Sequence, residues 1–490
     1  MNCSVKKISL ITAFLAVTGI SVSQTFNSSY FIQDFKYRHN LNAAFGNEQN
    51  YISIPALGNL NVKMQGDFGL GDLLFKNPST GKYDYTFMHP DVSVADALSG
   101  FSKGKNNISF DLGITILSAG FKAFGGYNTV EISEKTNIGV CLPYDLFEFA
   151  KDLKNKNYAF SDLGVQGRSY AEIALGHSRQ ITDELRIGAK VKFLLGVGRV
   201  NLEVNDMTAN FVGDKWVVSS VDTKAEVNIN GVKFVNKVSE YNGSRGGSYE
   251  HVDIGETKID KFGLDGIGLG LDMGAEYTVM DGLKVSAAIN DLGFINWKNS
   301  WILTQKNGTF EFDGFHDVKV KDNGSGKSIS DQIDDYEDQL SDFINLENSG
   351  DRGSSTHGLA ATMNIGAEYQ LPTYKPMTFG FLAQHRFNSK YSWTEARVSA
   401  NWSPLNWLNG GINFAASSFG LSTGWILNVH PSGFNFFIGM DHILGKQSKE
   451  FIPLSSNAHL SLGMNVTFGN KEKKKTVKVI ETPVNDDYVW

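Results

Sequence analysis

The chain has 490 residues, a formal net charge of -7 and two cysteines. A mildly acidic chain lacks the basic face that a nucleic-acid partner requires, so a nucleic-acid-binding function is excluded. With 51 glycines, 10 prolines and 12% aromatic residues, the composition favours β-structure.

The N-terminus has the pattern of a secretory signal peptide. Lys6 and Lys7 precede an uncharged apolar stretch over 8–20, and small residues follow up to Ser23. We expect cleavage after Ser23, which leaves Gln24 as the new terminus. Removal takes two lysines and no acid, so the net charge moves from -7 to -9. The alternative is a single membrane anchor, but the apolar stretch is short for a span.

The mature chain contains neither a disulfide nor an apolar helix of spanning length. Its one cysteine is Cys141, so no intrachain disulfide can form. After residue 23 no run of about 18 apolar residues occurs, which excludes a transmembrane helix. An exported chain of this kind needs another source of stability, and a closed ladder of strands supplies one.

Several segments alternate apolar residues with glycine or polar residues at a period of two. The clearest are 108–116, 185–197, 266–279 and 359–371. In 266–279 we expect one face to be apolar and the other to be rich in glycine with one aspartate. The apolar set is Ile267, Leu269, Leu271, Met273, Ala275, Tyr277 and Val279. A membrane barrel needs this pattern, with apolar side chains toward lipid and small or polar ones toward the lumen.

More strand-like runs follow closely near the C-terminus. They cover about 377–387, 393–402, 410–417, 421–430, 433–442 and 458–468. The alternative is a soluble β-sandwich or a secreted β-solenoid, whose strands also alternate. The strand length of about ten residues favours the barrel, because soluble strands average about 5–6 residues. We therefore predict an all-β transmembrane antiparallel barrel of about 14 strands, an even number in the range of about 12 to 18.

Short turns and long irregular stretches alternate along the chain. The long stretches are about 69–106, 143–168, 199–262 and 296–356, and we expect them to be external or to enter the lumen. Within 296–356 an apolar stripe at helical spacing predicts an amphipathic helix. The stripe includes Ile333, Tyr336, Leu340 and Phe343. A second apolar segment, with Phe147 and Phe149, is a candidate packing partner.

Two interpretations of the helix stay open. It either lends its stripe to a lipophilic ligand or packs on neighbouring loops with its acidic face in solvent. The candidate ligand-binding residues are Ile333, Tyr336, Leu340, Phe343, Phe147 and Phe149. The lysine-rich segment 470–490 is expected to be a periplasmic tail.

The sequence offers no catalytic or metal-binding motif. It has no Cys-x-x-Cys pair, no His-Glu-x-x-His and no phosphate-binding loop, and its ten histidines are scattered. We therefore expect no enzyme activity, no catalytic residues, no metal and no cofactor.

The chain resembles the FadL-like outer-membrane proteins, the long-chain fatty acid transporter superfamily, and within it an uncharacterised branch of unknown function. The resemblance lies in the export signal, the segment Arg38-His39-Asn40-Leu41-Asn42-Ala43-Ala44-Phe45 and the string Asn290-Asp291-Leu292-Gly293-Phe294-Ile295-Asn296-Trp297. It implies a 14-stranded barrel in the outer membrane of a Gram-negative cell, with an N-terminal hatch in the lumen. An Asn-Pro-Ala triplet of that hatch corresponds here to Asn42, Ala43 and Ala44, which lack the proline.

These inferences divide the chain into four parts and leave two function classes. The parts are a signal peptide at 1–23, a hatch at 24–56, the barrel with long external loops at 57–469 and the tail at 470–490. The first function is passive uptake of a hydrophobic, fatty-acid-like molecule through the plugged barrel. The alternative is a structural or protein-secretion-associated barrel without small-molecule transport. Expected partners are outer-membrane lipid, the barrel-assembly machinery and, for the alternative, other envelope proteins.

Overall fold

The computed structural model describes most of the expected mature chain. The described residues are 26–152, 154, 156–212, 215–240, 247–252, 258–259, 263–305, 308–312, 334–336, 339, 343, 346–442 and 457–469. The expected signal peptide at 1–23 and tail at 470–490 lie outside them, as do Ile333 and Leu340.

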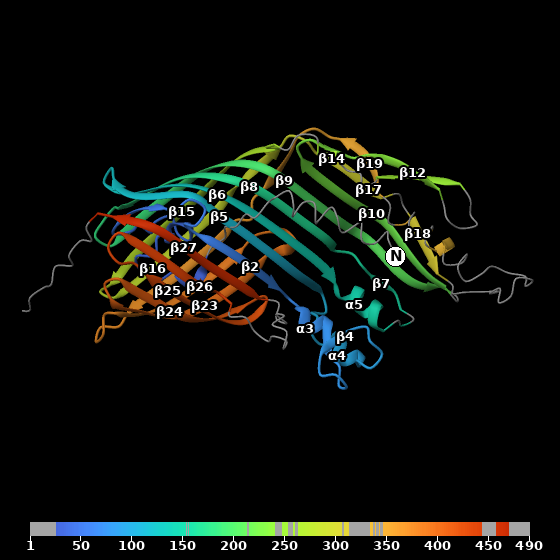
Figure 1. Cartoon of the computed structure of the whole chain (residues 1–490), viewed down its shortest axis with the longest axis horizontal. Helices are drawn as coiled ribbons and strands as arrows, with labels where there is room; N and C mark the ends of the chain where they lie inside the picture. Colours follow the sequence, from blue (N-terminus) through green and yellow to red (C-terminus); the bar gives the residue numbers. More distant parts are fainter. Residues whose placement is uncertain are drawn as a thin grey trace, which may run out of the picture.

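Fourteen strand positions form a closed antiparallel barrel (Figure 1). The first position is split into β1 (Asn50–Ser53) and β2 (Leu60–Gly66), and the eighth into β20 (Ser355–Gly358) and β21 (Thr362–Gln370). The others are β5 (Lys105–Ala123), β6 (Gly126–Pro143), β8 (Leu163–Gln180), β9 (Leu185–Val212), β15 (Gly266–Met280), β16 (Leu283–Trp297), β22 (Met377–Arg386), β23 (Trp393–Leu405), β24 (Leu408–Ser417), β25 (Gly420–Val429), β26 (Phe434–Met440) and β27 (Ala458–Phe468). Strand β27 pairs with β1 and β2, which closes the ring and confirms the predicted fold.

The two ends of the barrel differ in the length of their connections. At one end the connections are short, at 124–125, 181–184, 281–282, 371–376, 406–407 and 430–433. At the other end lie most of the longer connections, which carry the helices α3 (Leu70–Leu73), α4 (Val94–Leu98) and α5 (Tyr144–Lys151). We call these the short-turn end and the long-loop end.

The sheet of the barrel continues beyond the long-loop end (Figure 1). Strand β9 is 28 residues long, and its last part leaves β15 and pairs with β10 (Lys215–Ile229). Strand β10 pairs in turn with β17 (Trp301–Gln305) and β18 (Gly308–Phe312), and β17 pairs with β19 (Leu346–Asp351). We call this set the extension sheet.

Smaller strand pairs lie among the long connections. They are β3 (Leu74–Lys76) with β4 (Tyr83–Thr86), β11 (Val232–Lys233) with β14 (Lys258–Ile259), and β12 (Asn236–Glu240) with β13 (Ser248–Val252), while β7 (Tyr158–Ala159) pairs with β9. The expectation that 199–262 and 296–356 are irregular is therefore wrong, because the first range holds the end of β9 and all of β10, and the second holds β17, β18 and β19. Outside a membrane neither face must be apolar throughout, so these strands do not show the strict alternation of the barrel.

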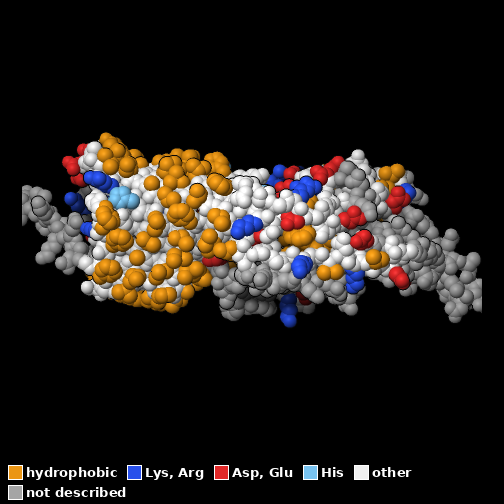
Figure 2. Space-filling view, turned by 90° about the horizontal axis from the view of Figure 1, so that it is seen from above, with side chains coloured by type: hydrophobic (Ala, Val, Ile, Leu, Met, Phe, Trp, Pro, Cys, Tyr) orange, Lys and Arg blue, Asp and Glu red, His pale blue; other side chains and the backbone are white. Residues whose placement is uncertain are grey.

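The outer surface of the barrel is apolar and its interior is polar. Figure 2 shows hydrophobic side chains gathered over the barrel half, whereas Lys, Arg, Asp and Glu mark the half with the extension sheet. On β15 the expected apolar face is outward, with Ile267 58% exposed, whereas Asp272 of the other face is 1% exposed. The alternation in the sequence therefore assigned the two faces of this strand correctly.

No helix among the described residues is long and apolar enough to cross a membrane.

Candidate functional site: the plugged lumen and its outer hollow

The N-terminal segment 26–49 fills the lumen as a plug. It contains two short 3-10 turns, η1 (Asn27–Ser29) and η2 (Arg38–Asn40), in a stretch rich in Asn, Ser and Asp, which favour turns. Its aromatic side chains are buried against each other and the wall: Phe26, Tyr30, Phe31, Phe35, Tyr37 and Phe45. The barrel wall begins at Asn50, inside the 24–56 range expected for the hatch.

Glycines on the lumen side of the wall make room for this plug. A Cβ atom on Gly188 would collide with Ala43, and one on Gly274 would collide with Asn42. Gly366, Gly380 and Gly439 stand in the same way against Tyr30, Phe31 and Phe26. At these positions of the wall, only glycine leaves enough space for the plug.

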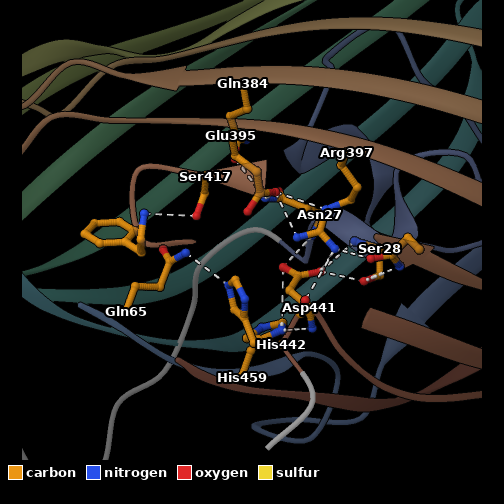
Figure 3. A network of polar contacts seen from close by, with 12 residues as sticks. Asn27, Ser28, Gln65, Gln384, Glu395, Arg397, Ser417, Asp441, His442 and His459 are labelled. Carbon is orange, nitrogen blue, oxygen red and sulfur yellow. Dashed lines mark hydrogen bonds and ion pairs between the residues drawn. The ribbon is translucent and has the colours of Figure 1, made fainter. Parts of the chain in front are cut away.

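The start of the plug is bound to a buried carboxylate on the loop after β26 (Figure 3). Asp441, which is 0% exposed, accepts hydrogen bonds from the backbone N–H groups of Asn27 at 3.0 Å and Ser28 at 2.7 Å, and from the Ser28 hydroxyl at 2.7 Å. Arg397 lies 3.8 Å from Asp441 and pairs with Glu395 at 2.8 Å. The N-terminal part of the plug is thus held by charge-assisted hydrogen bonds, which are the strong ones.

The second half of the plug is bound to the opposite wall. Lys190 of β9 donates to Nδ1 of His39 at 3.0 Å, so Nε2 of His39 carries the proton and donates to the Tyr51 hydroxyl at 2.9 Å. Burial, followed by the charge of Lys190, holds the pKa of His39 well below its ordinary value, in agreement with this neutral tautomer. Asn290 and Asn364 both donate to the carbonyl of Leu41, at 2.9 and 2.7 Å.

The predicted hatch residues lie where the plug meets β15 and β16. Asn42 donates to the carbonyls of Ala275 at 3.2 Å and Ala287 at 3.3 Å, and its Oδ1 accepts from the N–H of Ala44 at 2.9 Å. Asn42, Ala43 and Ala44 are all buried. The Asn42 side chain therefore closes a turn around Ala43, the position at which the family pattern has a proline.

Ion pairs join the side chains of five neighbouring strands of the wall, β6, β8, β9, β15 and β16. Lys192 contacts Asp272 at 2.7 Å and Asp291 at 2.6 Å, and Lys135 contacts Glu172 at 2.9 Å and Asp291 at 3.3 Å. Asp291 has a positive φ of 58° at a register shift between β15 and β16, and its N–H donates to Asp272 at 2.7 Å. The sequence analysis recorded Asp291 only as part of a family string. The sequence feature that could have identified Asp291 is a charged residue within an otherwise regular strand pattern.

Three hollows lead inward from the long-loop end. The outermost, which we call the outer hollow, has a volume of about 220 Å³ and is lined by Ile295, Trp297, Leu359, Phe387, Arg168 and Arg199, among others. The next has about 20 Å³ and the innermost about 50 Å³. Arg168 lines all three, so its guanidinium stands where the hollows meet.

The innermost hollow reaches an interruption in the wall. It is lined by Asn59 and Lys63, and Asn59 ends the segment 54–59 that separates β1 from β2. Within this segment Ala56 has a positive φ of 60°, and its N–H bonds to the carbonyl of Ile116 on β5 at 3.0 Å. The neighbouring strands are thus joined here by isolated backbone bonds instead of a regular ladder.

Among the candidate ligand-binding residues, Phe147, Phe149 and Tyr336 make aromatic contacts outside the lumen. Phe147 is buried with Phe68 and Phe101, and stacks on Phe101 at 3.8 Å between ring centroids. Phe149 contacts Trp216 of β10 at 5.3 Å, and Tyr336 contacts Phe312 of β18 at 4.8 Å. Trp216 and Phe312 are partners in the β10–β18 pairing, so Phe149 and Tyr336 both pack against the extension sheet.

The predicted helix stripe is described in part. Residues 334–336, 339 and 343 are helical, Phe343 is buried, and Gln305 donates to its carbonyl. Of the predicted stripe, Tyr336 and Phe343 are therefore placed against the extension sheet, whereas Ile333 and Leu340 lie outside the described residues. Within the described part of the chain, no group of His, Cys, Asp and Glu is arranged to hold a metal ion.

The strand order and the buried N-terminal segment define the class: a fourteen-stranded β-barrel with a plug formed by its own N-terminus. The model of a family of unknown function, DUF5723, matches residues 43–441, and the chain belongs to that family. This confirms the expected membership in a branch of unknown function. No curated protein matches the chain.

Solved structures with similarity to this chain include hydrocarbon channels. One is described as the TodX deltaS2S3 mutant monoaromatic hydrocarbon channel, with 8% identity, a TM-score of 0.41 and coverage of 92% of this chain and 96% of that chain. The Pseudomonas putida toluene transporter TodX has 8% identity, a TM-score of 0.38 and coverage of 93% and 97%. The Ralstonia pickettii toluene transporter TbuX has 9% identity, a TM-score of 0.37 and coverage of 90% and 92%.

Proposed function

We propose that this protein is an outer-membrane barrel that takes up a small, largely hydrophobic molecule. The apolar outer surface of a closed barrel supports the membrane location, because lipid would cover side chains that water would not solvate. The signal pattern at 1–23 supports export, and the long-loop end then faces outward.

The observation that carries the proposal is the row of three hollows. It begins in the outer hollow at the long-loop end, whose lining combines apolar side chains with Arg168, Arg199 and His357, and ends at the interrupted wall segment 54–59. Burial of a ligand against Trp297 and Leu359 removes apolar surface from water, at about 25 cal/mol per Å². Because the inner hollows are small, passage requires side chains between them to move. The exit lies at the interrupted segment 54–59 between β1 and β2, toward the lipid.

A binding experiment with the purified barrel tests this proposal. In detergent, 1-N-phenylnaphthylamine is expected to bind and to gain fluorescence. Leu359→Asn, which places an amide in the outer hollow, is expected to weaken binding about tenfold, since burying an unpaired polar group costs about 1–3 kcal/mol. Leu264→Asn, an exposed position outside the lining of this hollow, is the matched control. Absence of binding by the unmodified protein would contradict uptake.

The plug supports a second candidate, a sealed barrel with a structural or secretion-associated role. Hydrogen bonds join the plug to β9, β16, β21 and the loop after β26, so that it is fixed on several sides. This candidate predicts stable recovery of other envelope proteins with the barrel and no probe binding. Recovery of the single chain together with probe binding would favour uptake.

A further inference from the structure

We propose that the outer hollow selects a compact organic anion, whose acid group binds to Arg168 and whose apolar body lies against Trp297 and Leu359. The proposal rests on the proposed uptake function and specifies the chemical class of its ligand.

The first argument is the hydrogen bonding of Arg168 itself. Its side chain is buried, with 5% of the residue exposed. Nε donates to Asn137 Oδ1 at 3.3 Å and Nη1 donates to the carbonyl of Gly358 at 3.0 Å. Both of these acceptors are neutral, and a guanidinium has five N–H donors in a planar fork. Arg168 therefore retains donors for the two oxygens of a carboxylate or a similar acid.

The second argument is the balance of charge around Arg168. Of the nearby acids, Asp111 is paired with Arg386 at 3.4 Å. Glu226 is paired with Arg199 at 3.1 Å and lies 3.2 Å from His357. Asp291 at the innermost hollow is engaged by two lysines. Asp111 and Glu226 are thus each paired with another arginine, whereas the two lysines at Asp291 also pair with Glu172 and Asp272. Among the described residues, no carboxylate lies within ion-pair distance of Arg168.

The third argument is the cost of leaving this charge unmatched. A buried cation without an anionic partner is unfavourable, because desolvation is repaid only by a close opposite charge. A neutral ligand in the outer hollow would displace water from Arg168 and supply no such charge. An anion supplies it together with hydrogen bonds. Arg168 therefore makes the hollow more favourable for an anion than for a neutral molecule of the same shape.

The fourth argument is size. About 220 Å³ accommodates a single ring or a short branched chain, and the apolar wall is formed by Ile295, Trp297, Leu359 and Phe387. The 20 Å³ hollow beyond Arg168 has no room for an extended chain. The ligand class is thus an apolar body of ring size with one acid group.

Benzoate and benzamide, which share shape but differ in charge, test the proposal by calorimetry on the purified barrel at pH 8. Benzoate is expected to bind at least ten times more tightly than benzamide, since a hydrogen bond to a charged group contributes about 1.5–3 kcal/mol. Arg168→Met is expected to abolish this preference, and Arg168→Lys to keep part of it. Arg179→Met, on the same strand at the short-turn end, is the matched control.

The outcomes separate this proposal from the uptake function. Equal binding of the two ligands, or binding of neither by a barrel that binds 1-N-phenylnaphthylamine, overturns the anion proposal and leaves uptake standing. Failure of all three probes refutes both. If Arg168→Met does not fold, the comparison of benzoate with benzamide on the unmodified protein still decides.

Discussion

The bond between Asp441 and the plug gives the most direct test of how the lumen is closed. Replacing Asp441 by alanine removes three hydrogen bonds to Asn27 and Ser28, while Arg397 keeps Glu395 as a partner. At about 1.5 kcal/mol for each of the three bonds to a charged acceptor, the loss is about 4.5 kcal/mol. Ordering four backbone residues costs a similar amount, roughly 4–8 kcal/mol. The start of the plug is therefore expected to detach while the barrel persists.

Hydrogen exchange of the N-terminal peptide, measured by mass spectrometry, detects this detachment as faster exchange of its amides. A loss of about 4.5 kcal/mol accelerates exchange of the Asn27 and Ser28 amides by about two-thousandfold, at about 1.36 kcal/mol per tenfold change. Asp441→Asn keeps one acceptor oxygen and is expected to have a smaller effect. Asp183→Ala, in the short turn before β9, is the control and should leave these amides protected. Unchanged exchange in Asp441→Ala, with the strand content intact by circular dichroism, would refute the reasoning.

Two more predictions follow from the lumen and the long-loop end. Gly274→Ala is expected to increase hydrogen exchange in 38–46, because its Cβ would collide with Asn42. Gly104→Ala, with open space around it, should leave this exchange unchanged. Equal protection of 38–46 in both variants would contradict the steric role of Gly274. Burial raises the pKa of the Asp265 carboxyl to about 6, so its protonated form stabilises the fold. That stability is fully present below the unfolded pKa of about 4 and is lost as the pH rises to about 6. Exchange around 263–268, corrected for intrinsic pH effects, should therefore rise on the order of a hundredfold over this range, and Asp265→Asn should flatten the profile.

The strands of the barrel could be predicted from the sequence because one face of each strand lies on the outside of the barrel and the other faces the lumen. On β15, Ile267 and Asp272 took the expected faces because only apolar side chains suit the outside of the barrel. The strands of the extension sheet could not be predicted from the sequence. The outer surface of β10 need not be apolar, so residues such as Glu226 and Trp216 do not alternate in the way that barrel residues do. Propensity alone does not separate these strands from a loop.

The candidate site was readable only in outline. The position of the hatch at Asn42 followed from a family resemblance, and the glycine-rich strand faces indicated a crowded interior. The roles of Asp441 and Arg168 depend on distant partners: Asn27 is 414 residues from Asp441, and Gly358 is 190 residues from Arg168. Such pairings are set by the closure of the barrel, and no local pattern of spacing predicts them.

The length of strand β9 has a structural consequence. At roughly 3.3 Å per residue, its 28 residues span roughly 90 Å, about three times the thickness of the hydrocarbon core of a bilayer. One end of this strand carries Lys190, which binds His39 of the plug, and the other end carries the extension sheet. No loop intervenes between the two, so a single strand joins the extension sheet to the part of the wall that holds the plug.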